Sequence, residues 1–291
     1  MEKAQRNANL LLLLAAAIWG FSFVAQRVGM RHLGPLTFNG IRFGLGTLAL
    51  MPLLIVTLRR RAAAAAAPPI PWRDALIVGG LIFIGSNVQQ YGVMYTTAGK
   101  AGFITGLYVL FVPVLGLIWG VKTGRATWLG AVLAAVGLYL LSAKGVAGIG
   151  LGDGLVLISA VFWAMHVLMV GYTVRRMDAV LLAVIQFAVC TVLSLLGALI
   201  FESFVWESIK AAALPIFYAG VMSVAVAFSL QVYAQQKAEP AHTAILLSME
   251  SVFAALGGWL ILSEGLSMRG LFGCGLMLTG ILVAQVGPRK T

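Results

Sequence analysis

Charged residues are scarce in this sequence. Asp, Glu, Lys and Arg together make up 10% of its 291 residues, while hydrophobic residues make up 61%. A soluble domain usually carries about 25% charged residues, and a soluble fold of this size would lack the polar surface to cover so many apolar side chains. The composition therefore excludes an ordinary soluble protein and predicts an integral membrane protein.

Cysteine is also rare, and the motifs of several enzyme classes are missing. Cys190 and Cys274 both fall inside apolar runs, with no Cys-x-x-Cys motif and no Cys/His cluster, so we expect neither a disulfide nor a metal site. Gly99-Lys100 is followed by Ala101 instead of the Ser or Thr of a P-loop, and no Gly-x-Ser-x-Gly or His-Glu-x-x-His motif occurs. We therefore expect no cofactor and disfavour an ATP-driven pump or an intramembrane enzyme.

Among the few charged residues, acidic ones are outnumbered by basic ones. Nine Asp and Glu stand against 20 Lys and Arg, which gives a formal net charge of +11. In a soluble protein this charge would suggest nucleic acid, but here the basic residues stand in short connections between apolar runs, where they meet anionic headgroups. No basic helix or alternation of basic and aromatic residues is present. We expect the lipid bilayer, and no nucleic acid, as the partner of these charges.

Apolar runs long enough to span a bilayer fill most of the chain. A spanning helix needs about 20 mostly apolar residues. Ten windows qualify: 10–28, 36–57, 75–95, 101–120, 127–143, 152–174, 181–201, 211–232, 241–262 and 268–286. The longest connection holds Arg59-Arg60-Arg61 and the helix-stopping Pro68-Pro69-Ile70-Pro71. The sequence thus predicts an all-α integral membrane fold with ten transmembrane helices.

The distribution of basic residues predicts the orientation. With ten spans both termini lie on one side of the membrane, and that side collects thirteen of the Lys and Arg residues, against six on the other side. Because cytoplasmic loops carry the excess of basic residues, we expect both termini in the cytoplasm of a multi-pass protein of the bacterial inner membrane.

The chain also repeats itself at a nearly constant offset. Trp19 in the first span corresponds to Trp163 in the sixth, 144 residues later, and Arg42-Phe43 corresponds to Gln186-Phe187 at the same offset. Further matches at offsets of 142 and 143 are Gln89-Gln90-Tyr91 with Gln231-Val232-Tyr233, and Gly130 and Gly137 with Gly273 and Gly280. We predict two five-helix domains, residues 1–145 and 146–291. Since five is odd, the second enters the membrane from the opposite side, as an inverted repeat around a central cavity.

The sequence resembles the drug/metabolite transporter superfamily, in particular its EamA-type ten-span branch. The resemblance covers nearly the whole chain and rests on four stretches: Ala17-Ile18-Trp19-Gly20-Phe21, Arg42-Phe43, Glu250-Ser251-Val252-Phe253 and Leu262-Ser263-Glu264-Gly265-Leu266. The sequence departs from the pattern where Ser251 replaces a Pro and where Lys122-Thr123-Gly124 replaces a Glu turn. In the first half we take Val112-Pro113-Val114 as the stretch equivalent to Glu250-Ser251-Val252.

What the resemblance implies is export of small metabolites, amino acids among them. It also implies that spans 1, 3, 4, 6, 8 and 9 surround the cavity while spans 5 and 10 brace the outside. As the nearest functional analogy we take the YddG-like exporters of aromatic and other neutral amino acids. An analogy at the level of the fold does not fix a substrate.

Two charged residues fall deep inside predicted spans, where charge is costly and usually functional. Arg42 lies about two turns into span 2, and Glu250 lies near the middle of span 9. One hypothesis is that Arg42 binds the carboxylate of a zwitterion, because its planar fork bonds both oxygens, and that Glu250 binds the amine. Alternatively, Glu250 carries a proton that is coupled to transport. A third interpretation involves no substrate: both residues form a structural ion pair or an interhelical hydrogen bond.

Aromatic and polar residues at or near matched positions complete the predicted substrate site. The aromatic rings offer stacking or cation–π contact, and the polar groups need partners in mid-membrane, whether substrate or protein. The aromatic candidates are Trp19, Tyr91, Trp163 and Tyr233; the polar candidates are Ser22, Asn87, Gln90, His166 and Gln186. His166 is also a candidate proton relay, and plain packing remains the alternative for each residue.

The function that these features favour is secondary transport. We expect a transporter or uniporter that exports small metabolites, with neutral and aromatic amino acids as the best guess, by alternating access. The alternatives are an intramembrane enzyme and a channel-like membrane component. We expect a small-molecule substrate as partner and a monomeric protein, with a dimer as the alternative.

Overall fold

The protein is built from helices. The computed structural model describes residues 2–63, 69–120, 123–142, 150–265 and 267–286, and in these ranges it contains α-helices, one π-helix and no strand. The elements in chain order are α1 Glu2–Gly29, α2 Pro35–Ala63, α3 Trp72–Val93, α4 Ala98–Gly106, α5 Tyr108–Ile118, α6 Arg125–Ser142, α7 Leu151–Thr173, α8 Ala179–Phe201, α9 Trp206–Ala211, α10 Ala213–Phe217, the π-helix η1 Tyr218–Phe228, α11 Ser229–Ala234, α12 Pro240–Leu247, α13 Glu250–Leu262 and α14 Met268–Val286. The predicted all-α class is confirmed.

Eight helical stretches in the described part of the chain are long and apolar enough to cross a membrane. They are Gln5–Gly29, Pro35–Ala63, Trp72–Val93, Ala98–Ile118, Leu151–Thr173, Ala179–Phe201, Ala213–Ala234 and Pro240–Leu262. The other two predicted windows, 127–143 and 268–286, coincide with α6 and α14, whose apolar stretches within the described residues are Arg125–Gly137 and Met268–Ala284. The protein is a multi-pass membrane protein, while the count of ten spans stays a prediction.

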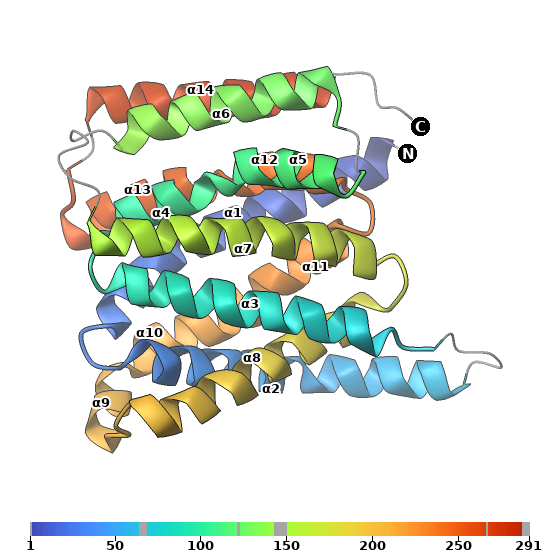
Figure 1. Cartoon of the computed structure of the whole chain (residues 1–291), viewed down its shortest axis with the longest axis vertical. Helices are drawn as coiled ribbons and strands as arrows, with labels where there is room; N and C mark the ends of the chain where they lie inside the picture. The colour runs from blue at the N-terminus through green and yellow to red at the C-terminus, as the bar shows by residue number, and fades with distance from the viewer. Residues whose placement is uncertain (1, 64–68, 121–122, 143–149, 266, 287–291) are drawn as a thin grey trace.

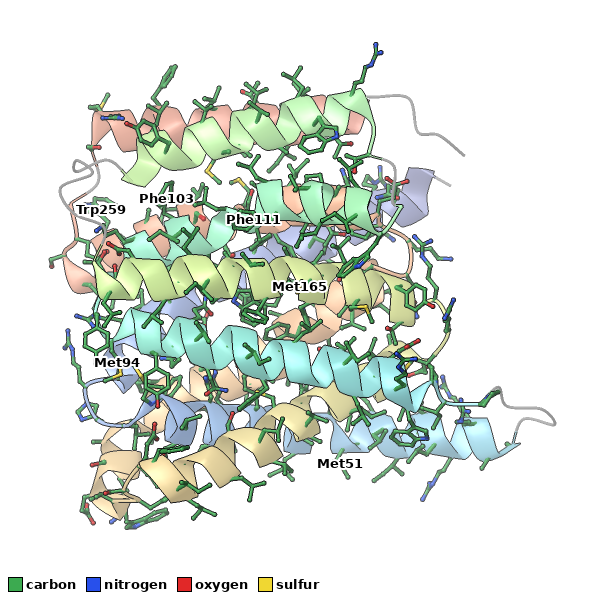
Figure 2. The ribbon with its side chains drawn as sticks, viewed as in Figure 1. Met51, Met94, Phe103, Phe111, Met165 and Trp259 are labelled. Carbon is green, nitrogen blue, oxygen red and sulfur yellow. The ribbon has the colours of Figure 1, made fainter. Side chains whose placement is uncertain are left out.

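Apolar side chains cover the outside of the bundle. Met51 and Trp259, both labelled in Figure 2, have exposed fractions of 38% and 52%, and many other large apolar residues are at least as exposed. A soluble protein would bury such residues, because exposed apolar surface is unfavourable in water. Here the surrounding lipid is as apolar as the side chains, so the exposure carries no such cost.

The helices pack in pairs (Figure 1). α6 lies along α14 in an outer layer, α2 lies along α8 at the opposite edge, and α3 lies along α7 between them. α1 runs through the interior and contacts α13 and η1. The beginning of α1 and the end of α14 lie at the same end of the bundle, as an even number of crossings requires. The predicted division at residues 145 and 146 lies outside the described residues, and the two domains stay a prediction.

Glycines at matched positions bring α6 and α14 into close contact. A Cβ atom on Gly130 would lie 2.6 Å from the Gly280 carbonyl oxygen, and one on Gly137 would lie 2.6 Å from the Gly273 carbonyl oxygen. No real side chain tolerates that distance, so glycine is what allows the two backbones to approach. Each glycine contacts the glycine that matches the other member of its pair: Gly130 meets Gly280, and Gly137 meets Gly273. This exchange is expected where two antiparallel helices at matched positions pack on each other.

Two of the spans are broken near their middle, and the breaks lie 142 residues apart. α4 ends at Gly106 and α5 begins at Tyr108, while α12 ends at Leu247 and α13 begins at Glu250. At each break a backbone amide donates its hydrogen bond to the carbonyl three residues earlier instead of four. An example is the bond from Leu107 N to Ile104 O. α4 lies beside α13 and α5 beside α12, so the broken helices run antiparallel (Figure 1).

The position of the first break corrects one expectation from the sequence. Tyr108, not Val112, occupies the place that corresponds to Glu250, because both begin the second half of a broken span. Pro113 lies inside α5 rather than at the break. The Ser251 hydroxyl donates a 2.6 Å hydrogen bond to the Gly102 carbonyl oxygen and so joins α13 to α4 close to both breaks.

Candidate functional site: a central polar cavity

A central cavity lies where the broken spans meet α1, α3, α7 and η1. It encloses about 500 Å³ of space, counting the part that opens outward, which is in the size range of small-molecule sites. Its lining residues are Trp19, Phe23, Gln26, Arg42, Gln89, Thr105, Tyr108, Trp163, His166, Val167, Ser223, Phe228, Gln231, Leu247 and Glu250. α6 and α14 contribute none of these residues, in keeping with the expected outer position of spans 5 and 10.

The structure brings five of the eleven predicted site residues to the cavity wall. These are Trp19, Arg42, Trp163, His166 and Glu250. Three others are buried directly behind the wall: Ser22 accepts a hydrogen bond from Gln26, Gln90 donates to the Gln26 carbonyl oxygen, and Gln186 pairs with His166.

The remaining three predicted residues lie further from the cavity. Asn87 is buried among α2, α3 and α8, where its amide bonds Asn39 and Ser194. Tyr91 is only partly buried, and the Tyr233 side chain is 60% exposed on the outside of the bundle. The internal repeat of the sequence placed the two tyrosines at matched positions, but it did not indicate which side of each helix faces the cavity.

Arg42 reaches the cavity from α2 and is almost completely buried. Its Nε donates a 2.7 Å hydrogen bond to Asn39 Oδ1, and its guanidinium carbon lies 5.7 Å and 5.0 Å from the ring centres of Phe38 and Phe43. Among the described residues no carboxylate lies within salt-bridge distance of this guanidinium. A buried cation without an acid partner is expensive, so Arg42 is available to an anionic group that enters the cavity.

Glu250 begins α13 and lines the same cavity. Its side chain is 4% exposed, and Oε1 has no hydrogen-bond partner in the described part of the structure. The Tyr108 hydroxyl lies beside this carboxyl, but without the geometry of a full hydrogen bond. A polar group left unpaired in a buried site costs free energy. Glu250 and Tyr108 therefore form a polar pair that is ready to accept a ligand donor or a proton.

Aromatic rings form the remaining wall. Phe228 stands at the centre, with ring centres of Trp19 at 4.6 Å, Trp163 at 5.8 Å and His166 at 6.1 Å. Trp19 is fixed further by a 3.1 Å hydrogen bond from Nε1 to the Ser223 carbonyl oxygen of η1. The Trp163 Nε1 and His166 Nδ1 atoms are buried and have no hydrogen-bond partner among the residues that the structure describes. The wall combines a large apolar area with unused polar atoms, as small-molecule sites usually do.

Five pairs of lining residues stand at the offsets of the internal repeat. At 144 residues the pairs are Trp19 with Trp163 and Phe23 with Val167; at 142 they are Gln89 with Gln231, Thr105 with Leu247 and Tyr108 with Glu250. Ten of the fifteen lining residues thus stand at positions that match at the offsets of the predicted repeat. Position is shared in each pair, while residue type is shared in only two.

Several lining residues escaped the sequence-based selection of site residues. Phe23, Gln26, Thr105, Tyr108, Val167, Ser223, Phe228 and Leu247 all line the cavity. Pairing by offset would have found Phe23 from Val167 or Tyr108 from Glu250, but the type of residue differs within those pairs. Ser223 and Phe228 come from a π-helix, whose period differs from the α-helical one and which no periodicity in the sequence predicted.

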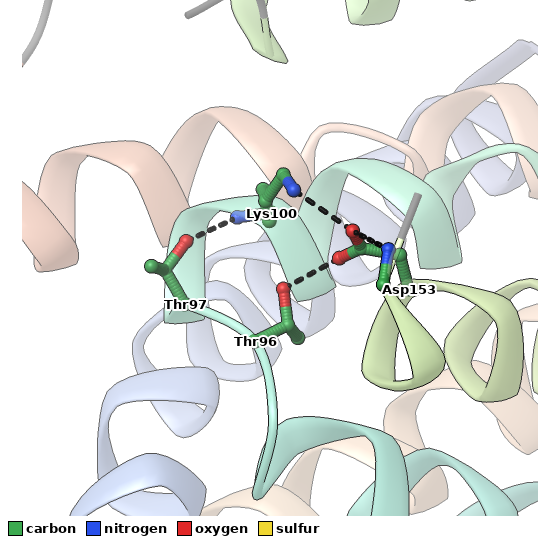
Figure 3. Close-up of polar contacts among 5 residues, drawn as sticks. Thr96, Thr97, Lys100 and Asp153 are labelled. Atoms are coloured by element: carbon green, nitrogen blue, oxygen red, sulfur yellow. Dashed lines mark hydrogen bonds and ion pairs between the residues drawn. The ribbon is translucent and has the colours of Figure 1, made fainter. Parts of the chain in front are cut away.

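Polar contacts join neighbouring helices at opposite ends of the bundle (Figure 1). At one end Asp153 accepts hydrogen bonds from Thr96 Oγ1 at 2.7 Å, Lys100 Nζ at 2.8 Å and Gly150 N at 3.1 Å, which ties α4 to α7 (Figure 3). At the matched place in the other half, His242 of α12 lies 3.0 Å from Asn9 of α1. The Lys100–Asp153 contact is an ion pair, and the His242–Asn9 contact joins an imidazole to an amide.

The chain matches a known protein family over nearly its whole length. The model of the EamA-like transporter family matches twice, at residues 6–143 and 150–285. An Archaeoglobus fulgidus protein named an uncharacterized transporter is 30% identical over 96% of this chain and 86% of its own length. The uncharacterized transporter YoaV of Bacillus subtilis is 22% identical over 91% of this chain and 92% of its own.

Two further comparisons bear on the fold and on the class of protein. The uncharacterized inner membrane transporter YedA of Escherichia coli is 26% identical over half of this chain. A solved structure superposes with a TM-score of 0.76 over 96% of both chains at 18% identity, which shows a shared fold. The helical membrane fold, the central cavity and the double family match agree, and the chain belongs to the EamA-like transporter family of membrane transporters.

Proposed function

We propose that this transporter is a secondary carrier for small zwitterions, with neutral and aromatic amino acids as substrates, and that it works by alternating access as an exporter. The observation that carries the proposal is that one buried cation, Arg42, and one buried acid, Glu250, line the same cavity without pairing with each other. An α-amino acid offers a carboxylate for the first and an ammonium for the second.

The aromatic wall supports the second part of the proposal. Phe228, Trp19 and Trp163 line the cavity with aromatic rings, which suit an apolar or aromatic side chain. An apolar pocket discriminates only weakly between similar side chains. We therefore expect several neutral amino acids to share one site, with the aromatic ones bound most tightly.

The matched halves support alternating access. The lining residues stand in pairs at the repeat offsets, so one arrangement open to one compartment has a counterpart open to the other. We further propose that both termini are cytoplasmic in the bacterial inner membrane, on the basis of the excess of basic residues on that side. The protein is proposed to act as a monomer, since its cavity is formed within one chain.

Transport by purified protein in liposomes tests this function. Vesicles preloaded with unlabelled L-phenylalanine should take up labelled L-phenylalanine, L-tryptophan or L-leucine in a saturable counterflow, while labelled L-glutamate and L-lysine should be poor substrates. Absence of counterflow for every neutral amino acid would contradict the substrate class. Non-saturable flux would favour a channel, and a chemically altered product would favour an enzyme.

A pH gradient across the same vesicles tests the role of Glu250 as a proton carrier. If protons are coupled to transport, a gradient should drive net movement of L-phenylalanine against its concentration, and Glu250→Gln should abolish that response while counterflow persists. A wild-type protein that ignores the gradient is a uniporter, and Glu250 then acts on the substrate ammonium.

A further inference from the structure

Asn87 is buried among α2, α3 and α8, in a chain of hydrogen bonds that ends on Arg42, which lines the cavity. Arg42 Nε donates to Asn39 Oδ1 at 2.7 Å, Asn39 Nδ2 donates to Asn87 Oδ1 at 2.9 Å, and Asn87 Nδ2 donates to Ser194 Oγ at 3.0 Å. Asn87 Nδ2 also donates to the Phe83 carbonyl oxygen at 2.8 Å. The chain thus joins α2, α3 and α8, which are packed side by side.

The direction of every bond in this chain is fixed by its ends. A guanidinium only donates, so the Asn39 oxygen must face Arg42 and the Asn39 nitrogen must face Asn87. A backbone carbonyl only accepts, so the Asn87 nitrogen must face Phe83 O, which leaves the Asn87 oxygen for Asn39. Reversing either amide would place two donors or two acceptors against each other.

This arrangement leaves one edge of the guanidinium for a ligand. Phe38 and Phe43 lie near the guanidinium, and Asn39 occupies the Nε edge. The two terminal nitrogens form no hydrogen bond with the described residues, and Arg42 lines the cavity. Paired terminal nitrogens match the two oxygens of a carboxylate in a bidentate contact.

We infer that Asn39 and Asn87 are positioning residues that hold Arg42 with its two terminal nitrogens turned to the carboxylate of the substrate. The inference rests on the proposed function, because it takes the carboxylate as the group that Arg42 binds. It changes the role expected of Asn87 from contact with the substrate to support, through Asn39, of the residue that holds the substrate. Ser194 and Phe83 O act as the fixed end of the chain, on α8 and α3.

A purely structural network would stabilise the bundle without affecting which chemical group is recognised. Recognition is therefore measured as a ratio, the affinity of the purified protein for L-phenylalanine divided by that for L-phenylalaninamide, which lacks the carboxylate charge. Binding in detergent by calorimetry avoids passive diffusion of the amide. Wild type should prefer L-phenylalanine, and Arg42→Gln should lower the ratio by about tenfold or more, the size of a lost charge-assisted contact.

Asn87→Ala should lower the same ratio by about three- to tenfold in the wild-type background and leave it unchanged in the Arg42→Gln background, because both changes act through one contact. Gln235→Ala is the matched control. It removes a buried amide that donates to the Val167 carbonyl oxygen and accepts from Gln231, and that has no hydrogen bond to Arg42, Asn39 or Asn87 among the described residues. It should lower the melting temperature without changing the ratio, because a general effect on the cavity acts on both compounds alike.

The outcomes separate the inference from the function on which it rests. If Arg42→Gln keeps the ratio of the wild type, the carboxylate assignment of Arg42 is wrong. If Arg42→Gln lowers the ratio but Asn87→Ala does not, or if Asn87→Ala lowers it equally in both backgrounds, the positioning role is wrong. The Arg42 Nε–H signal of ¹⁵N-arginine-labelled protein is a test without ligand: it should be protected from exchange in wild type and lose protection in Asn87→Ala, and a signal that keeps its protection would overturn the inference.

Discussion

Trp19 and Trp163 stand 144 residues apart, line the same cavity and are the same residue, whereas Tyr108 and Glu250 stand 142 residues apart, line the same cavity and differ in charge. In both pairs each residue occupies the matching point of its half, and the second pair begins the second part of a broken span. The comparison separates two tasks. We infer that the predicted repeat provides the shape of the cavity, and we propose that its departures from exact repetition provide the polarity that orients a substrate.

The largest effect is expected where the two halves differ in charge. Glu250→Gln removes the acid that we assign to the substrate ammonium, and should weaken binding of L-phenylalanine by on the order of tenfold or more, since hydrogen bonds to charged groups contribute about 1.5–3 kcal/mol. The affinity for 3-phenylpropionate, which lacks the ammonium, should stay the same. Calorimetric titration of both compounds measures this.

Tyr108→Phe is the control from the matched position. It removes a hydroxyl without changing charge, and should weaken L-phenylalanine binding by only a few fold, because a neutral hydrogen bond contributes about 1 kcal/mol. Equal losses for Tyr108→Phe and Glu250→Gln would mean that the two halves of the cavity act alike on the substrate, against the division of tasks argued above.

The next largest effect is expected on stability, at the glycine contacts between α6 and α14, where matched positions hold the same residue. Gly137→Ala should destabilise the protein by about 1–3 kcal/mol, because its new methyl group meets the Gly273 carbonyl oxygen at 2.6 Å and forces α6 away from α14. Gly280→Ala should have a similar effect, because Gly280 meets the Gly130 carbonyl oxygen at the same distance. Thermal unfolding in detergent, followed by tryptophan fluorescence, measures both.

Gly275→Ala provides the control within α14. A Cβ at Gly275 has no neighbour within 4 Å among the described residues, and alanine favours the helix, so the melting temperature should stay level or rise. A fall for Gly275→Ala as large as that for Gly137→Ala would show that α14 tolerates no substitution. The close approach of the two glycine pairs would then not explain the effect.

The two ends of the bundle offer a third comparison. Asp153→Ala removes three contacts at once, from Thr96, Lys100 and Gly150 N, whereas Asn9→Ala removes the amide that faces His242. We expect Asp153→Ala to cost about 2 kcal/mol, since it leaves the buried Thr96 hydroxyl unpaired and removes two further contacts, and Asn9→Ala to cost about 1 kcal/mol. The apparent melting temperature should therefore fall further for Asp153→Ala, and the reverse order would contradict the assignment of the stronger contact to that end.

The fold was largely predictable because lipid imposes simple rules on sequence. Windows of apolar residues and the repeat offset anticipated the helices, and eight of the ten windows meet the length and hydropathy of a span. The breaks at Leu107 and Ser248 were not anticipated, because they arise where antiparallel half-helices meet and no proline marks them. A backbone that deviates from the helix inside a membrane depends on partners from other spans, which a pattern along the chain does not contain.

Cavity-lining residues were predictable from the sequence where their type is unusual for a membrane span or is repeated at a matched position. Charge inside a span identified Arg42 and Glu250, and matched aromatic residues identified Trp19 and Trp163, all of which line the cavity. The choice among amides was poor: Asn87 faces away from the cavity while Gln26 lines it. Which face of a helix points inward is decided by packing, and the apolar residues on both faces of these spans leave no contrast from which to read it.

The smallest effect separates the two tryptophans, which the comparison above treats as equal. The Trp19 Nε1 donates to the Ser223 carbonyl oxygen, while the Trp163 Nε1 has no partner in the described structure. Trp19→Phe should therefore cost about 1 kcal/mol more stability than Trp163→Phe, since only the first removes a hydrogen bond. Both variants keep an aromatic face, so the affinity for L-phenylalanine should change by less than about threefold in each. A melting temperature that falls equally for both would mean that the hydrogen bond contributes nothing. If Trp163→Phe alone lost affinity, its free N–H would be a group that binds the substrate, and the two halves would then differ in function even where their residues are identical.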